Sequence, residues 1–176
     1  ETAREYLQVT ITILFMDLRN ADTDDIPEIQ DVAEICYQSA YDGVLNAKTI
    51  DKVLEDRYSR EELAEIISSD NSILTVAEEN NQIVGFAFIS WKESDAELDS
   101  IYIIPEYQGQ GIGTKMLDFV IKKIPDQVES VGVGAIKENE AARRFYTSKG
   151  FEEKDEVMED FYGEKAECQT FIKKLD

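Results

Sequence analysis

The fold is decided by one stretch, Leu98-Asp-Ser-Ile-Tyr-Ile-Ile-Pro-Glu-Tyr-Gln-Gly-Gln-Gly-Ile-Gly-Thr114. A strand-like run ends at Pro105, a glycine-rich turn follows, and the turn opens a helix. The first N–H groups of a helix have no partner inside the helix, and the helix dipole adds positive potential there. Glycine lets the main chain come close to an anion. The stretch therefore predicts a cradle for a phosphate or pyrophosphate.

Two common nucleotide-binding loops have a different spacing. A P-loop places Lys and Ser/Thr after its last glycine, whereas Gly113 is followed by Thr114-Lys115. A Rossmann loop follows the first strand of its βαβ unit, whereas this loop lies deep in the chain. Both are poor matches.

Outward from this loop, the apolar patterns predict a mixed α/β sheet in one domain. Helical spacing predicts helices at residues 26–40, 49–56, 59–67, 111–124 and 138–149. Strand patterns cover residues 9–18, 73–78, 83–91, 97–104, 128–135, 153–159 and 167–175. Asn80-Asn81 predicts a hairpin turn, because Asn tolerates positive φ.

The first helix should begin with an acidic cap, Asp24-Asp25, with Asp25 and Glu28 forming a capping box. A second helix start is expected at Ser59, where Glu62 completes Ser-x-x-Glu. Residues 1–15 are interpreted as an N-terminal extension of unassigned role, and residues 16–176 as the domain.

Charge narrows the classes of partner. The chain has 18 basic and 38 acidic residues, a net charge of −20, which argues against nucleic-acid binding. The acidity fits a surface adapted to high cytoplasmic salt, or else an acidic cleft that attracts a polycationic substrate. Because acids occur all along the chain, the surface interpretation is favoured. The apolar run Ile11–Met16 is far shorter than a membrane span, so a cytoplasmic protein with no membrane partner is expected.

Histidine is absent from the chain. This excludes His-based triads, His general bases and His-ligated metals. With only two cysteines, Cys36 and Cys168, a structural zinc site would need carboxylate ligands, so no metal site is expected. The two lie far apart in the sequence, and a disulfide is neither required nor excluded.

Two motifs carry a resemblance to a known family. The loop Gln108–Gly113 resembles in full the Gln/Arg-x-x-Gly-x-Gly/Ala pyrophosphate signature of the GNAT acetyltransferase superfamily, and Ile101–Pro105 resembles the strand that pairs with pantetheine. Asn139-Glu-Ala-Ala-Arg-Arg-Phe-Tyr-Thr-Ser-Lys-Gly-Phe151 resembles the family's second signature. The resemblance runs from about Asp17 to the C-terminus. It implies a single-domain GNAT fold, a twisted, mostly antiparallel sheet with helices on both faces.

The resemblance implies an N-acetyltransferase that moves acetyl from acetyl-CoA to a primary amine by direct attack, without metal. A small cationic amine or polyamine is favoured, because Tyr41–Leu45 resembles the polyamine-acetylating branch. A protein N-terminus or lysine is the alternative acceptor. A non-catalytic acyl-CoA sensor and an interaction protein with an acidic face are rival functions. A homodimer is possible.

Catalytic roles follow from the same resemblance. Tyr146 is the candidate general acid, with a core aromatic as the plain alternative. Glu97 stands where the family has a strand carboxylate and is the candidate general base through water, with Asp99 in reserve. Strict strand alternation would put Glu97 on one side with Asp99, Ile101 and Ile103.

The resemblance also implies a set of contacts. The residues expected at the donor site are the main-chain groups of Ile101 and Ile103, the loop residues Gln108, Gly109, Gln110, Gly111, Ile112, Gly113 and Thr114, and the side chains of Asn139 and Arg143. Asn139 fits a helix N-cap almost equally well, and Arg143 fits a surface position. Many relatives carry Arg or Lys at the position of Gln110. This chain lacks that positive charge near the phosphates, and Lys115 or Lys137 could supply it instead. Tyr41, Asp42 and Trp91 are candidates for the amine pocket, although ordinary packing is the commoner role.

Overall fold

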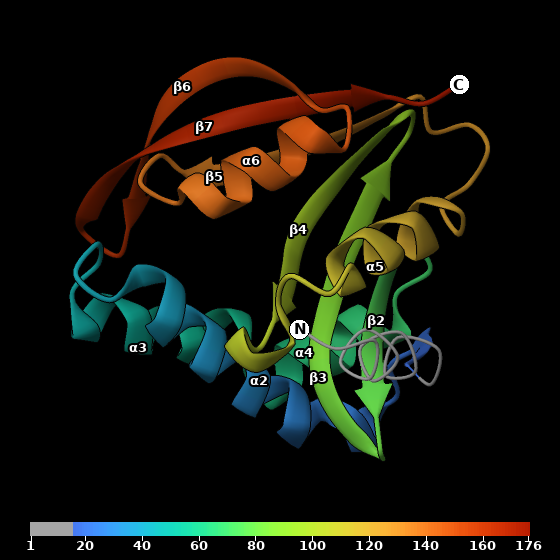
Figure 1. Ribbon diagram of the computed structural model, residues 1–176, viewed down its shortest axis with the longest axis horizontal. Coiled ribbons are helices and arrows are strands. Elements are labelled where there is room, and N and C mark those ends of the chain that lie inside the picture. Colours follow the sequence, from blue (N-terminus) through green and yellow to red (C-terminus); the bar gives the residue numbers. More distant parts are fainter. Residues whose placement is uncertain (1–15) are drawn as a thin grey trace, which may run out of the picture.

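The computed structural model describes residues 16–176, whose strands form one seven-stranded sheet in the order β1-β2-β3-β4-β5-β7-β6 (Figure 1). Neighbouring strands are antiparallel except for the parallel pair β4 and β5. The strands are β1 Asp17–Asn20, β2 Ser72–Glu79, β3 Gln82–Lys92, β4 Asp95–Ile103, β5 Ser130–Ile136, β6 Glu152–Phe161 and β7 Glu164–Lys174. The predicted mixed α/β sheet is confirmed.

Helices cover both faces of the sheet. On one face α2, α3 and α4 build an apolar core with β2 and β3, and on the other α5 and α6 build a second core with β3 to β5 and β7 (Figure 1). The helices are α2 Ile26–Tyr41, α3 Ala47–Arg57, α4 Arg60–Ser68, α5 Ile112–Ile121 and α6 Glu140–Ser148, with short 3-10 segments η1 Thr23–Asp25 and η2 Pro105–Tyr107. No helix in residues 16–176 is long and apolar enough to cross a membrane.

Local sequence chemistry explains several turns and helix starts. Ser59 accepts a hydrogen bond from the Glu62 amide at 3.2 Å and caps α4, as predicted. Asn80 and Asn81 turn the β2–β3 hairpin with φ values of 51° and 61°, also as predicted. Cys36 and Cys168 are both buried free thiols.

The predicted cap of α2 is confirmed in position at Asp25, which is the N-cap residue, but the predicted capping box with Glu28 is wrong. Asp22, not Asp24, caps η1, the short segment ahead of α2, by accepting a hydrogen bond from the Asp24 amide at 2.8 Å. Asp25 makes no side-chain cap bond for α2 and instead binds the Arg19 guanidinium in a fork at 2.7 and 2.8 Å. Glu28 accepts from the amide of Ile83 at 2.9 Å. Charge-assisted bonds to partners outside the helix thus replace the predicted box of Asp25 and Glu28. Asp25 instead forms a capping box with Asp22, whose amide donates to it at 2.8 Å.

Some boundaries also move. The helix predicted to reach residue 124 ends at Ile121, ahead of Pro125, which disfavours helical backbone in the residue before it. The first predicted strand is confirmed only from Asp17, because residues 9–15 and the proposed N-terminal extension lie outside the described residues.

The parallel pair β4–β5 separates soon after it forms. Pairing is limited to Asp95–Glu97 with Ser130–Gly132, and the two strands then diverge (Figure 1). The main chain of β4 beyond Glu97 therefore has β3 on one side and no strand on the other. This opening in the middle of the sheet positions the candidate site.

Candidate active site

A cleft of about 790 Å³ lies along the end of β4, where that strand no longer pairs with β5. Its walls come from β4, the loop that follows it, the start of α5, the inner side of α6 and part of α2. Most of the predicted donor-site residues meet here: Ile101, Ile103, Gln108, Gly109, Gly111, Ile112, Gly113, Thr114, Asn139 and Tyr146 all line it. We call this space the donor cleft.

The glycine-rich loop has the backbone that an anion cradle needs. Gly109 and Gly111 have φ values of 75° and 82°, which side-chain-bearing residues rarely adopt. Gly111 is the N-cap of α5 and brings no side-chain cap bond, so its place leaves the first α5 amides open to the cleft. The side-chain amide of Gln108 donates to the carbonyl of Ile103 at 2.8 Å, and the side-chain amide of Gln110 donates to the carbonyl of Glu106 at 3.3 Å. These bonds brace the loop.

The main chain of β4 also turns toward the donor cleft. The Ile104 amide donates to the Val84 carbonyl at 3.0 Å, which makes residue 104 a hydrogen-bonded partner of β3. Because such partners alternate along an antiparallel pair, the main-chain groups of Ile101 and Ile103 point away from β3. The bond from Gln108 to the Ile103 carbonyl agrees with this direction. Both residues thus have the geometry expected for pairing with an extended ligand.

A β-bulge corrects the predicted side-chain alternation of β4. Phe88 pairs with Ser100 and Ile89 with Leu98, so Asp99 is an extra residue without a partner in β3. Beyond the bulge, odd-numbered and even-numbered residues exchange the faces of the sheet on which they lie. Leu98 packs in the α5-side core before the bulge, and Ile101 packs in the same core after it. Glu97 therefore does not share a side with Ile101 and Ile103, as strict alternation had predicted.

Glu97 and Asp99 instead line a second cavity, of about 530 Å³, which we call the acceptor cavity. Its walls also include Tyr37 and Tyr41 from α2, Arg57 from α3 and parts of β5, β6 and β7. Tyr102 lines both spaces, so the donor cleft and the acceptor cavity adjoin at β4.

Glu97 and Asp99 hold their protons more tightly than ordinary carboxyl groups, because the pKa of each is raised. Burial raises the pKa of Glu97, and the charge of Asp99 adds to the shift. Burial also raises the pKa of Asp99, although the Ser90 hydroxyl at 3.0 Å and the charge of Arg57 act against it. A Cβ on Gly132 would lie 2.8 Å from Oε2 of Glu97, so the glycine in β5 allows the close approach of this carboxylate.

Tyr146 packs among three phenylalanine rings on the inner side of α6. Its ring centroid is 5.5 Å from that of Phe145, 5.6 Å from Phe151 and 5.7 Å from Phe171. Burial raises the pKa of its phenol well above the ordinary value, and Tyr41 and Glu97 add to the shift. The phenol therefore stays protonated at neutral pH, within electrostatic reach of the acceptor cavity.

Other predicted residues are divided between sites. Asn139 caps α6 by accepting from the Ala142 amide at 3.1 Å, and it also lines the donor cleft, so both of its expected roles fit. Tyr41 lines the acceptor cavity, with its hydroxyl 3.4 Å from that of Tyr102. Asp42 is exposed and Trp91 packs with the α5-side core, and neither lines the acceptor cavity.

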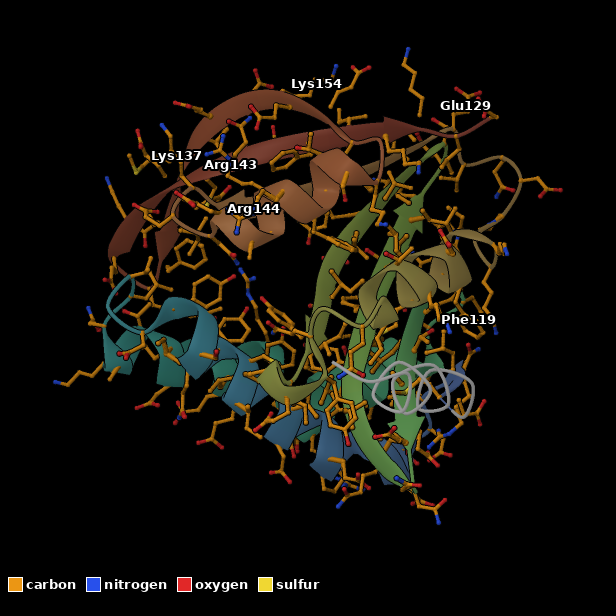
Figure 2. The ribbon with its side chains drawn as sticks, viewed as in Figure 1. Phe119, Glu129, Lys137, Arg143, Arg144 and Lys154 are labelled. Atoms are coloured by element: carbon orange, nitrogen blue, oxygen red, sulfur yellow. The ribbon has the colours of Figure 1, made fainter. Side chains whose placement is uncertain are left out.

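The structure does not bring Arg143 to the donor cleft. Its guanidinium pairs with Glu153 of β6 at 3.1 Å, on the other side of α6 (labelled in Figure 2). Lys137, labelled beside it, pairs with Glu156 at 3.0 Å and with Glu167 at 3.4 Å. These acidic partners explain why neither cation lines the donor cleft.

Three residues of the acceptor cavity escaped the sequence analysis. Tyr37 precedes Tyr41 by one helical turn, a spacing that could have indicated a shared face. Tyr102 was hidden by the bulge, which brings it to the same side of β4 as Glu97, where strict alternation would not put it. Arg57 carries no local signal, because its place in the cavity depends on how α3 packs.

Comparison with known proteins gives the family. The acetyltransferase (GNAT) domain family matches residues 33–162. Spermidine N(1)-acetyltransferase of Thermoplasma acidophilum is 25% identical over 157 residues, which is 85% of this chain and 96% of that protein.

Solved structures share the fold. PaiA N-acetyltransferase from Thermoplasma acidophilum, in complex with coenzyme A, has a TM-score of 0.73 at 22% identity, covering 88% of this chain and 97% of that one. Ribosomal-protein-S18-alanine N-acetyltransferase from Escherichia coli has a TM-score of 0.69 at 17% identity, covering 90% and 93%. Since the family match spans most of the chain and the fold agrees, the protein belongs to the GNAT acetyltransferase family and is an acetyl-CoA-dependent N-acetyltransferase.

Proposed function

We propose that the acceptor is the primary amine of a small cationic molecule that enters the acceptor cavity. The carboxyl groups of Glu97, Asp99, Asp155 and Glu159 line this cavity, and such groups attract an ammonium ion. The observation that carries the proposal is the place of Glu97. It lies in the wall of the acceptor cavity and within electrostatic reach of Tyr146, which lines the donor cleft.

In the proposed reaction Glu97 takes a proton from the ammonium group through a water molecule. The free amine nitrogen then attacks the thioester carbonyl carbon, and its new C–N bond drives the carbonyl electrons onto oxygen. Main-chain N–H groups of β4, at Ile101 or Ile103, are proposed to donate to that oxyanion, and their direction away from β3 supports this role. When the carbonyl re-forms, the C–S bond breaks and Tyr146 donates its proton to the departing thiolate. The amide nitrogen loses its surplus proton to solvent, and a proton from solvent restores the Tyr146 phenol.

The loop from Gln108 to Gly113 is proposed to hold the pyrophosphate of acetyl-CoA. Support comes from the positive φ of Gly109 and Gly111 and from the uncapped start of α5. Asn139 is proposed to contact the pantetheine arm, because it lines the same donor cleft as Ile101 and Ile103. The pairing of Arg143 with Glu153 argues against the phosphate contact expected for Arg143.

The test is release of free coenzyme A thiol from acetyl-CoA with a panel of polyamines, amino acids, aminoglycosides and peptides. We expect turnover with one class of small amines. Acetylation of peptides alone would redirect the assignment to a protein N-terminus or lysine, the alternative acceptor. No turnover with any amine, despite coenzyme A binding in calorimetry, would refute the proposed acceptor.

The Tyr146→Phe variant tests the chemistry separately from binding. Losing the phenol proton should lower kcat by about 100-fold or more, while coenzyme A binding stays unchanged. Glu129→Gln is a matched surface control, because this exposed acid lies outside both cavities (labelled in Figure 2). Full activity of Tyr146→Phe would remove Tyr146 from the mechanism.

A further inference from the structure

Arg57 is a cation in an acidic cavity. It is the last residue of α3, and it lines the acceptor cavity together with Glu97 and Asp99. A basic residue suits the negative end of a helix dipole, which explains its place in α3. The dipole does not explain why the side chain lines the cavity.

No carboxylate of residues 16–176 forms an ion pair with Arg57 within 4.0 Å. Its side chain has a polar contact with the phenol of Tyr162. Its charge also acts on Tyr37, Tyr58 and Tyr102 and, at longer range than an ion pair, on Asp99. The second cation of the cavity, Lys154, differs because it pairs with Glu152 at 3.0 Å. Although the chain has 38 acidic residues, none of those in the described part of the chain compensates the charge of Arg57 with an ion pair.

A guanidinium group in this setting suits a carboxylate ligand. Its planar set of N–H donors matches the two carboxylate oxygens and binds them as a fork. Carboxyl groups and a guanidinium in one cavity of about 530 Å³ can engage a small molecule at both of its charged ends. A linear polyamine that filled the same cavity would bring an ammonium group close to Arg57, and like charges oppose binding.

We propose that the acceptor is an amine that also carries a carboxylate, as an amino acid does, and that Arg57 binds this carboxylate while the amine faces Glu97. This rests on the proposed function and narrows its small cationic amines to those with an anionic group. A basic amino acid meets both conditions, because it has two amines and one carboxylate. Arg57 then selects among acceptors without touching the thioester.

Matched substrates test this directly. L-Ornithine and putrescine differ by one carboxylate, and so do L-lysine and cadaverine. The full-length enzyme should have a kcat/KM for the carboxylated member that is about 10- to 100-fold higher, as expected for a charge-assisted hydrogen-bond pair. Amino acids in the wider amine panel should likewise exceed their decarboxylated counterparts.

The variant Arg57→Gln should remove this preference, by lowering kcat/KM for the amino acids and leaving the diamines unchanged or improved. Arg57→Lys should keep part of it, since it retains the charge but loses the fork. Arg60→Gln is the matched control, an exposed arginine of α4 that does not line the acceptor cavity. Calorimetry with coenzyme A should give the same affinity for all four proteins.

Three results would overturn the inference. One is a wild-type enzyme that uses diamines as well as, or better than, amino acids. Another is an Arg57→Gln variant that loses the same factor on both members of each pair, which would make Arg57 only a positioning residue for Asp99. The third is a best substrate without any anionic group. The proposed function fails separately, if no amine in the panel is acetylated while coenzyme A still binds.

Discussion

At the scale of single residues, catalysis and stability favour different protonation states of Glu97. Burial and the charge of Asp99 raise the pKa of Glu97 in the folded protein, so the folded state favours the protonated carboxyl. Its favourable contribution is therefore complete below the unfolded pKa and is lost as the pH rises through the folded pKa. The proposed general base, however, must be ionised. Glu97 would therefore act as the ionised carboxylate, which is the protonation state that the folded protein disfavours.

The Glu97→Gln variant should expose this conflict. At neutral pH its kcat/KM should fall by about 100-fold, because the base is absent, while its melting temperature rises. The gain in melting temperature should shrink as the pH falls through the folded pKa of Glu97, and it should be gone below the unfolded pKa, where the carboxyl is neutral in both states. The measurements are thermal melts and thiol release across pH, with Glu129→Gln as the control. An unchanged acid limb of the pH–rate profile in Glu97→Gln would contradict the base role.

At the scale of elements, the junction between β4 and α5 depends on backbone conformation. Gly111→Ala should strain the φ of 82°, at about 1 to 2 kcal/mol, and should raise the KM for acetyl-CoA. Gly134→Ala in β5 is a useful contrast, because this glycine has no positive φ and no atoms within 4 Å of an added Cβ. It should leave the KM for acetyl-CoA unchanged and the melting temperature equal or higher. Equal KM values for the two variants would contradict the cradle.

The same scale shows what the sequence can predict. The glycine loop, the Asn80-Asn81 turn and the Ser59 cap follow from chemistry within a few residues, and they were predicted. The predicted capping box of Asp25 and Glu28 failed because the stronger partner of Asp25, Arg19, comes from β1. The bulge at Asp99 inserts a residue into a pattern of period two, which hydrophobicity alone does not reveal.

Residue positions that depend on packing were predictable only in part. The family resemblance named Tyr146, Asn139 and the loop, and the structure places them around one donor cleft. It did not indicate that Arg143 turns to Glu153 or that Arg57 reaches the acceptor cavity, because both depend on contacts between distant elements.

At the scale of the whole molecule, charge dominates. Eighteen basic and 38 acidic residues repel one another on balance, and in the described residues seven ion pairs offset only part of this. At about 1 M KCl the Debye length is ~3 Å, against ~10 Å at 0.1 M, so the repulsion is largely screened. We expect the melting temperature to rise steadily with KCl. An uncharged osmolyte of equal osmolarity is the control, and a flat response to KCl would contradict salt adaptation.

The short ladder between β4 and β5 has a further consequence for the catalytic cycle. Only three residues of each strand hold the middle of the sheet together, so beyond them the edge of β4 that faces away from β3 has no strand paired to it. An extended acetyl-CoA molecule that bonds to the main chain of Ile101 and Ile103 would pair with this edge and act as a temporary eighth strand. Each turnover would then close the sheet and reopen it, so that the protein is most rigid while it carries its acetyl group and loosest when it is empty.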